Sequence, residues 1–324
     1  MTREDSAGVA PDAGSRAMKR YLLGLLLGGF LALLLFVALL ASLAMRGALP
    51  PPQIANSLCL DEKLAWMQEH PPGAPNLLVV GSSVAWRHFN SAEAVRANPA
   101  LRPYNAGLCG ISIGQTEKVV ASLLKRLNTV HQMVLIASPV DFSDCSSANP
   151  ANFDMEAADR FVFQRSPAYH FYLRYFDPGT LLMNSFNLRA ERSDSTSFDS
   201  LVINSFGDGP LDPPRPRKLL YGEAQFDPRC FSALQRIAKL TQRQGVSLFV
   251  SLTPLNPRWV DQFDKNGLVQ QQLRQQAKAA LAGTGATLVL PPKLPERAFF
   301  DAIHLRWRYT GIFTRMLVAH AQPS

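Results

Sequence analysis

The chain has 324 residues, of which 47% are hydrophobic, and a formal net charge of +8. This length and composition exclude an intrinsically disordered chain and suffice for one α/β domain of about 250 residues with attached segments. The positive charge could suggest nucleic acid, but the Lys and Arg residues are scattered, without a basic helix or an RNA-binding aromatic motif. The charge therefore favours a nearby anionic lipid surface or acidic polymer.

The first long apolar segment is 21–45, which holds 25 residues without a charged side chain. As a helix that rises about 1.5 Å per residue, it would exceed a hydrocarbon core of roughly 30 Å, so we expect a transmembrane anchor. The alternative is a cleaved signal peptide, since Ser42-Leu43-Ala44 offers small residues at a suitable spacing. The apolar core of such signals usually spans only about 7–15 residues, which favours the anchor.

The orientation of this anchor follows from the basic residues that flank it. Arg16, Lys19 and Arg20 precede the segment, whereas after Arg46 the next basic residue is Lys63. Positively charged flanks stay in the cytoplasm, so we expect a single-pass protein whose main domain, from about residue 47, lies on the outer side of that membrane.

The chain then divides into segments of different composition. Residues 1–20 form the expected cytoplasmic tail, and 46–75 the linker and the start of the domain. Within that linker, Gly47 to Gln53 is Pro-rich and predicts a semi-rigid spacer. The α/β domain is expected over 76–324, with an insertion at about 142–228.

Short apolar runs alternate with helical patterns along this domain. Strands are predicted at 77–81, near 102–105, and at 133–137, 246–252 and 286–290. Helices are predicted at about 83–97, 112–127, 231–244, 266–282 and 307–321. Strands that alternate with helices favour a parallel sheet covered on both faces. The pattern therefore predicts a flavodoxin-like three-layer α/β/α sandwich with a five-stranded parallel sheet.

The insertion at 142–228 has two parts. The first is rich in aromatic residues between 160 and 176, and the second, from about 192 to 217, carries Ser, Asp, Gly and Pro. The aromatic part is interpreted either as helices that pack against the sheet or as a lid or substrate wall, because long insertions in compact domains are often functional.

Two serines follow the first predicted strand, in the sequence Gly81-Ser82-Ser83. In a parallel α/β sheet, ligands bind beyond the carboxyl ends of the strands, so one of these hydroxyls should lie at that rim near a helix N-terminus. Serine is also a favoured helix N-cap. We therefore expect a cap at Ser82 beside a nucleophile at Ser83.

An acidic residue and a histidine stand just before the last helix. Asp301 precedes His304 by three residues. At that spacing the carboxylate can accept a hydrogen bond from the imidazole, fix its tautomer and stabilise the imidazolium. A serine at neutral pH needs such a base to act as a nucleophile. The spacing alone is a weak signal, because Asp301 could be a helix cap.

Taken together and in this order, the two fragments resemble the SGNH or GDSL-type hydrolase superfamily over about residues 76–317, the insertion excepted. The resemblance implies a flavodoxin-like fold and a triad of Ser83, His304 and Asp301. Ser82 stands where many members have Asp. This variant is similar to the branch with the D-alanine transfer protein of teichoic acids and bacterial exopolysaccharide acetylation proteins.

The second block of the family, Asn-x-x-x-x-Gly, is matched by Asn105 and Gly110. The resemblance implies that the backbone N–H groups of Ser83 and Gly110 form the oxyanion hole, where the missing Cβ of glycine lets substrate approach. The alternative for Gly107 and Gly110 is an ordinary turn into the next helix.

The third block departs from the family pattern, because Val140 stands where an asparagine is expected. The loss of one oxyanion donor typically costs about 10²–10³ in turnover. Either another group, such as Ser138, replaces it, or the protein is specialised or inactive. Asp141 is interpreted as a turn or helix cap.

Two further side chains could contact substrate. Arg87 follows the proposed nucleophile together with Trp86 and His88, where it could meet an anionic group or lie on a solvated face. Trp307 could stack on a sugar ring or pack in the core.

The four cysteines show no zinc spacing and could form two disulfides in an oxidising compartment, with three possible connectivities. They are Cys59, Cys109, Cys145 and Cys230. Because Cys109 and Cys145 flank the second and third blocks at the same rim, a bridge between them is one hypothesis.

The resemblance implies a membrane-anchored, extracytoplasmic serine esterase or O-acyltransferase that acts on acyl groups of cell-envelope polysaccharide. It requires no metal and no cofactor, and it implies an integral-membrane acyltransferase as a partner. The alternative is a catalytically degenerate module that binds glycan or assembles an envelope complex. Val140 favours that alternative, whereas Ser83, Asp301 and His304 oppose it.

Overall fold

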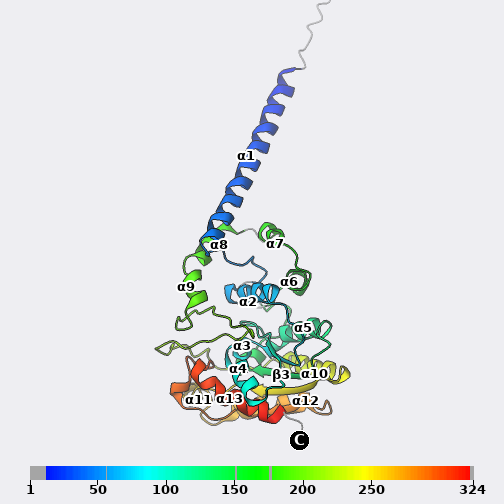
Figure 1. The fold of residues 1–324 in the computed structure, drawn as a ribbon, viewed down its shortest axis with the longest axis vertical. Coiled ribbons are helices and arrows are strands. Elements are labelled where there is room, and N and C mark those ends of the chain that lie inside the picture. Colours follow the sequence, from blue (N-terminus) through cyan, green and yellow to red (C-terminus); the bar gives the residue numbers. More distant parts are fainter. Residues whose placement is uncertain (1–11, 56, 150–151, 175–176, 322–324) are drawn as a thin grey trace, which may run out of the picture. The chain divides into compact units, whose positions relative to one another are not determined.

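The computed structural model describes residues 12–55, 57–149, 152–174 and 177–321. The chain divides into two compact units, one that ends at Leu49 and one that begins at Pro50. The first consists mainly of helix α1 (Asp12–Met45). By length and composition, Gly14–Met45 can cross a membrane. Of the expected cytoplasmic tail, residues 1–11 lie outside the described residues, and the remainder continues α1 without a break (Figure 1).

The second unit is built on a five-stranded, all-parallel sheet with the strand order β2-β1-β3-β4-β5. The strands are β1 (Leu77–Gly81), β2 (Pro103–Asn105), β3 (Gln132–Ala137), β4 (Ser247–Leu252) and β5 (Thr287–Val289). The mixed α/β class and the parallel sheet predicted from the sequence are confirmed. β1 lies between β2 and β3. The chain therefore adds β2 on one side of β1, and then β3, β4 and β5 on the other side.

Helices cover both faces of the sheet. The first apolar cluster receives Leu78 and Val80 of β1 and packs against α5 (Ile113–Leu124), α10 (Pro228–Arg243) and α12 (Leu268–Leu281). The second receives Leu77 and Val79 and packs against α3 (Ser83–His88), α4 (Ser91–Ala97), α11 (Pro257–Phe263) and α13 (Trp307–Ala321). Because both faces of each strand are buried, the strands read as continuous apolar runs.

One helix predicted at 83–97 is two helices in the structure. α3 ends at His88, Phe89 adopts an extended backbone, and the side chain of Asn90 caps α4 by accepting a hydrogen bond from the N–H of Glu93 at 3.1 Å. The interpretation of α3 as a solvated face is wrong. Trp86, Arg87 and His88 are buried, because α3 packs between the sheet and α13.

The second unit begins within the Pro-rich segment that the sequence analysis had expected to be a spacer. Pro51 and Pro52 are buried, and the hydroxyl of Tyr172 donates a hydrogen bond to the carbonyl of Pro50. The following helix α2 (Leu58–Glu69) contributes side chains to the first apolar cluster. The expected linker therefore contains a helix that belongs to the core.

Two disulfides join Cys59 to Cys109 and Cys145 to Cys230. The hypothesis of a bridge between Cys109 and Cys145 is therefore wrong. Cys59 lies in α2, which the sequence analysis treated as part of the linker. The partner of Cys109 is therefore this residue and not Cys145.

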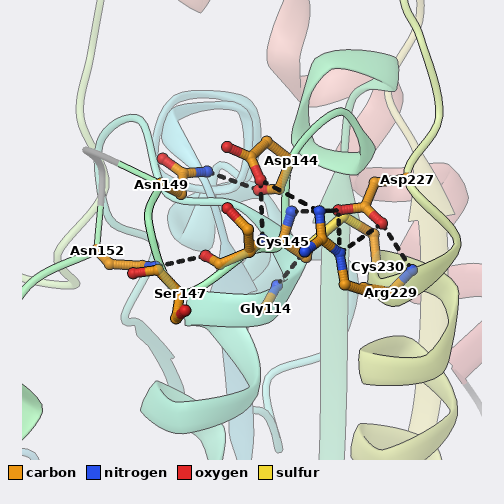
Figure 2. A network of polar contacts seen from close by, with 10 residues as sticks. Gly114, Asp144, Cys145, Ser147, Asn149, Asn152, Asp227, Arg229 and Cys230 are labelled. Atoms are coloured by element: carbon orange, nitrogen blue, oxygen red, sulfur yellow. Dashed lines mark hydrogen bonds and ion pairs between the residues drawn. A yellow bond between two sulfur atoms is a disulfide. The ribbon is translucent and has the colours of Figure 1, made fainter.

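The insertion leaves and rejoins the domain at one point, which Figure 2 shows from close by. Phe142 accepts a backbone hydrogen bond from Asp227 at 2.8 Å, next to the Cys145–Cys230 bridge. The carboxylate of Asp227 accepts from the N–H of Cys145 at 2.8 Å and pairs with Arg229. The disulfide and the two hydrogen bonds of Asp227 therefore close the base of the insertion.

In the part of the insertion that the structure describes, there are four helices and a long irregular segment. The helices are α6 (Met155–Val162), α7 (Ala168–Arg174), α8 (Pro178–Ser185) and α9 (Leu188–Ser193). The aromatic part packs into the first apolar cluster, and the main contacts of α6 are with α2 and α5. Phe161 and Phe171 meet edge to face with ring centroids 5.2 Å apart.

Candidate active site

Ser83 is the first residue of α3, directly after β1. Gly81 has a φ of 135°, and a Cβ at this position would lie 2.1 Å from the carbonyl oxygen of Ile136. Glycine is therefore required for the sharp turn from strand to helix. Ser82 is the N-cap: its Oγ accepts from the N–H of Val84 at 3.4 Å and donates to Asp141 Oδ2 at 2.9 Å. The expected cap at Ser82 is confirmed.

Asp301 organises the turn that carries the histidine. Its Oδ1 accepts hydrogen bonds from the backbone N–H groups of Ile303 and His304 at 2.9 Å and 2.8 Å. Its Oδ2 lies 2.8 Å from His304 Nδ1. Burial alone would raise the pKa of Asp301, but His304 and the backbone N–H groups together lower it to about 2. The group is therefore a carboxylate at neutral pH.

Ser83 and His304 meet although 221 residues separate them in the chain. Ser83 Oγ lies 2.8 Å from His304 Nε2. Because the carboxylate of Asp301 can only accept, it selects the tautomer with a proton on Nδ1 and leaves Nε2 to accept from the serine hydroxyl. The structure thus brings together the three residues of the predicted triad, in the geometry that nucleophilic catalysis requires. Their catalytic role stays a prediction.

His88 binds the backbone of the residue that follows His304, a role that the sequence analysis missed. Its Nε2 accepts a hydrogen bond from the N–H of Leu305 at 2.9 Å, and Nδ1 lies 2.8 Å from Thr253 Oγ1. An Nε2 that accepts from a backbone N–H carries no proton, so Nδ1 is the donor to Thr253. Burial, with His304 adding to it, holds the pKa of His88 well below its usual value. A neutral imidazole therefore fixes the residue next to His304.

Tyr221 is a second residue that the sequence analysis did not find. Its hydroxyl donates to Asp301 Oδ2 at 3.2 Å, and its φ of 59° is unusual for a residue other than glycine. Nearby, the carbonyl of Leu219 accepts from the N–H of Ala302 at 3.1 Å. The end of the insertion, after residue 217, therefore forms a wall of the site. Among the described residues, no hydrogen bond joins the aromatic part to the triad. No local pattern marks Tyr221.

The second block forms a loop against the end of β1. Leu108 donates a backbone hydrogen bond to Gly81 at 3.0 Å, and a Cβ on Gly107 would lie 2.4 Å from the N of Trp86. Gly107 is thus required by close packing against α3. Gly110 is exposed and has a φ of 69°. Its place in an oxyanion hole stays a prediction.

The side chain of Asn105 holds this loop and the insertion together. It donates to the carbonyl of Ala85 at 3.1 Å and to Asp208 Oδ1 at 3.0 Å, and it accepts from the N–H of Gly107 at 3.0 Å. Asp208 belongs to the insertion and is fully buried. Asn105 is thus a structural residue that couples β2 to the insertion.

The third block lies in the short 3₁₀ helix η1 (Pro139–Phe142). Asp141 caps it, as expected, by accepting from the N–H of Ser138 at 2.7 Å. Burial raises the pKa of Asp141 to about 6, against the lowering effect of the hydrogen bonds from Ser138 and Ser82. Val140 packs against the second apolar cluster. Its side chain has no donor for an oxyanion.

Arg87 and Trp307 have structural contacts. The guanidinium of Arg87 donates to the carbonyl of Ser200 at 2.7 Å and lies 4.1 Å from the ring of Trp86. Burial lowers the pKa of Arg87 to about 10, so it stays charged. Trp307 is half-buried at the start of α13. The substrate contacts expected of both stay predictions.

Within the described ranges, no group of three or more His, Cys, Asp and Glu side chains is arranged to hold a metal ion. Searches against protein-family models and curated protein sequences found no match to this chain. The case for a function therefore depends on the site itself: a hydroxyl, an imidazole and a carboxylate in one line of hydrogen bonds at the rim of a parallel sheet.

Proposed function

We propose that the protein is a serine esterase or O-acyltransferase of the SGNH type that acts on acyl groups of cell-envelope polysaccharide. The observation that carries the proposal is the 2.8 Å contact between Ser83 Oγ and His304 Nε2, with Asp301 behind the imidazole. A hydroxyl bonded to an imidazole that a buried carboxylate orients is an arrangement that acyl transfer requires.

In this proposal Ser83 Oγ attacks the acyl carbonyl carbon while His304 Nε2 takes its proton. The tetrahedral intermediate collapses when the imidazolium returns that proton to the leaving sugar oxygen, which leaves an acyl-serine. Water or a second sugar hydroxyl then takes the acyl group by the same route. The backbone N–H groups of Ser83 and Gly110 would stabilise the oxyanion.

The proposed location is the outer side of the bacterial inner membrane. The apolar helix α1 is long enough to serve as an anchor, and the basic residues before it favour a cytoplasmic N-terminus. The two disulfides support an oxidising compartment for the second unit. An integral-membrane acyltransferase would be the partner that supplies the acyl group.

Turnover of p-nitrophenyl acetate by the full chain in an uncharged detergent tests the proposal. We expect hydrolysis by the wild-type chain and its loss in Ser83→Ala. The adjacent Ser82→Ala is the matched control, because it removes a helix cap worth about 1 kcal/mol and leaves the nucleophile in place. Equal activity in all three chains, or none in a folded wild-type chain, would contradict the proposal.

A second candidate is a non-catalytic glycan-binding or assembly module. The observation that favours it is Val140, whose apolar side chain stands where the proposed family has an amide donor. This candidate predicts no turnover by the wild-type chain and no effect of Ser83→Ala on glycan binding.

A further inference from the structure

A cavity of about 660 Å³ is lined in part by Asp301, and positively charged side chains are the most numerous group in its lining. A volume of this size is typical of small-ligand sites. Two carboxylates, Glu296 and Asp301, also line it. The cationic side chains are Arg217, Lys218, Arg258, Arg297, Arg306 and Arg308.

Three of these arginines already pair with carboxylates of the chain. The pairs are Arg217 with Asp199 at 3.5 Å, Arg258 with Glu296 at 3.6 Å and Arg308 with Asp212 at 2.9 Å. Four of the six side chains in these pairs are at least half exposed and Arg217 is 48% exposed. Ion pairs between exposed groups are weak, of the order of 0–1 kcal/mol. A ligand carboxylate can therefore compete for these guanidinium groups.

The other three cations leave a positive excess. Arg306 donates to the carbonyls of Phe299 at 3.2 Å and Pro213 at 2.9 Å, which neutralises no charge. In the part of the chain that the structure describes, Lys218 and Arg297 form no ion pair, and both are exposed. The carboxylate of Asp301 is already bound to His304. The cavity is thus a cationic site beside the triad.

We propose that this cavity binds a segment of an acidic glycan, through carboxylate groups carried on its sugar rings. The planar guanidinium can match a carboxylate with two parallel hydrogen bonds. Arg308 meets Asp212 through Nε alone, which lies 3.0 Å and 2.9 Å from the two carboxylate oxygens. The binding itself does not depend on catalysis. Its role in presenting substrate rests on the proposed function.

The aromatic lining argues against single-stranded nucleic acid as the ligand. Proteins that bind it combine a basic groove with aromatic rings on which successive bases stack. Here the two aromatic residues are Phe299, which is fully buried, and Tyr309, which is half-buried. No row of exposed rings is offered to the bases within this cavity.

The cavity is connected to the triad through Asp301 and through Asn256, which holds Asp301 in place. Asp301 lines the cavity and orients His304, and Asn256, also in the lining, donates to the carbonyl of Asp301 at 2.9 Å. Because Asp301 belongs to both, a glycan strand held in the cavity would lie next to the triad. An acyl ester on the same strand would then be delivered at high effective concentration.

The test measures binding of fluorescent oligogalacturonate to the full chain in uncharged detergent, in a Ser83→Ala background that removes catalysis. We expect saturable binding at low salt that weakens as salt rises, since the screening length falls from about 10 Å at 0.1 M to about 3 Å at 1 M. Replacing both unpaired cations, Lys218→Gln with Arg297→Gln, should weaken binding about fivefold.

The matched control is Lys239→Gln with Arg243→Gln, which removes the same charge from exposed positions of α10 and should leave the affinity unchanged. Thermal unfolding of both double variants checks the fold. Equal weakening in the two double variants, or tighter binding of polyphosphate or of a single-stranded oligonucleotide than of oligogalacturonate, would overturn the proposal. Binding without esterase activity would leave this site standing and count only against the proposed function.

Discussion

Asp301 performs a separate task with each carboxylate oxygen. Oδ1 shapes the turn by accepting from two backbone N–H groups, and Oδ2 orients the imidazole of His304. The pKa of Asp301, about 2, lies below its usual value because the interactions with His304 outweigh the effect of burial. The carboxylate therefore stabilises the fold fully above about pH 4, and this contribution is lost as the pH falls towards 2.

The substitution Asp301→Asn separates these tasks. An amide can keep the backbone hydrogen bonds through its oxygen, but its NH₂ group faces Nδ1 and selects the tautomer with a proton on Nε2. That tautomer cannot take the proton of Ser83, so we expect kcat for p-nitrophenyl acetate to fall by about 10⁴-fold.

The comparison variant is Tyr221→Phe, which removes one hydrogen bond to Asp301 Oδ2 and leaves the carboxylate in place. One such bond is worth about 0.5–1.5 kcal/mol, so kcat should fall by about tenfold or less. Similar losses in the two variants would show that Asp301 does not act through the tautomer of His304.

The elements were predictable from the sequence where the apolar pattern is continuous. The strands 77–81 and 133–137 and the helix at 307–321 lie where the pattern placed them, because buried parallel strands and amphipathic helices leave a local signature. The break at Phe89 and the helix α2 were missed. The pattern of α2 is interrupted by Asp61, Glu62 and Lys63, all of which are buried. Asp61 accepts from the nearby N–H of Ile54, whereas Glu62 and Lys63 have long-range partners that no local pattern reveals.

The disulfides connect elements that the sequence analysis kept apart. The Cys59–Cys109 bridge ties α2 to the loop that carries Gly110, and the Cys145–Cys230 bridge closes the base of the insertion (Figure 2). The two bridges close segments of 50 and 85 residues. Each should stabilise the fold by about 2–4 kcal/mol.

Removing the bridges one at a time should separate stability from activity. We expect Cys59→Ala with Cys109→Ala to lower both the melting temperature and kcat, because the loop of Gly110 loses its tether. Cys145→Ala with Cys230→Ala should lower the melting temperature with a smaller change in kcat, since the hydrogen bonds that join Asp227 to the backbone at Phe142 and at position 145 still close the insertion. An unchanged kcat in the first pair would argue against Gly110 as an oxyanion donor.

At the scale of the whole molecule, the site follows from the strand order. β1 is the point from which the chain turns to β2 on one side and to β3 on the other, and ligand sites of parallel sheets lie at such switch points beyond the carboxyl ends of the strands. Ser83 stands at this end of β1, and the segment before α13 brings His304 to it. The meeting of Ser83 and His304 was predictable, because the carboxyl ends of parallel strands lie at the same edge of the sheet.

The surroundings of the triad could not be predicted in the same way. His88, Tyr221 and the cationic cavity depend on contacts between distant segments, several of them from the insertion. An insertion has no strand order to constrain it, so its path over the site follows from side-chain packing alone. The sequence thus located the reactive groups, and the structure supplied the residues that hold them.

The central claim is that His304 activates Ser83, and covalent labelling tests it most directly. The full chain is treated with a serine-directed fluorophosphonate, digested and mapped by mass spectrometry. The account predicts one adduct, on the hydroxyl of residue Ser83, that is lost in His304→Ala. A folded wild-type chain without an adduct, an adduct on another residue, or undiminished labelling in His304→Ala would contradict it.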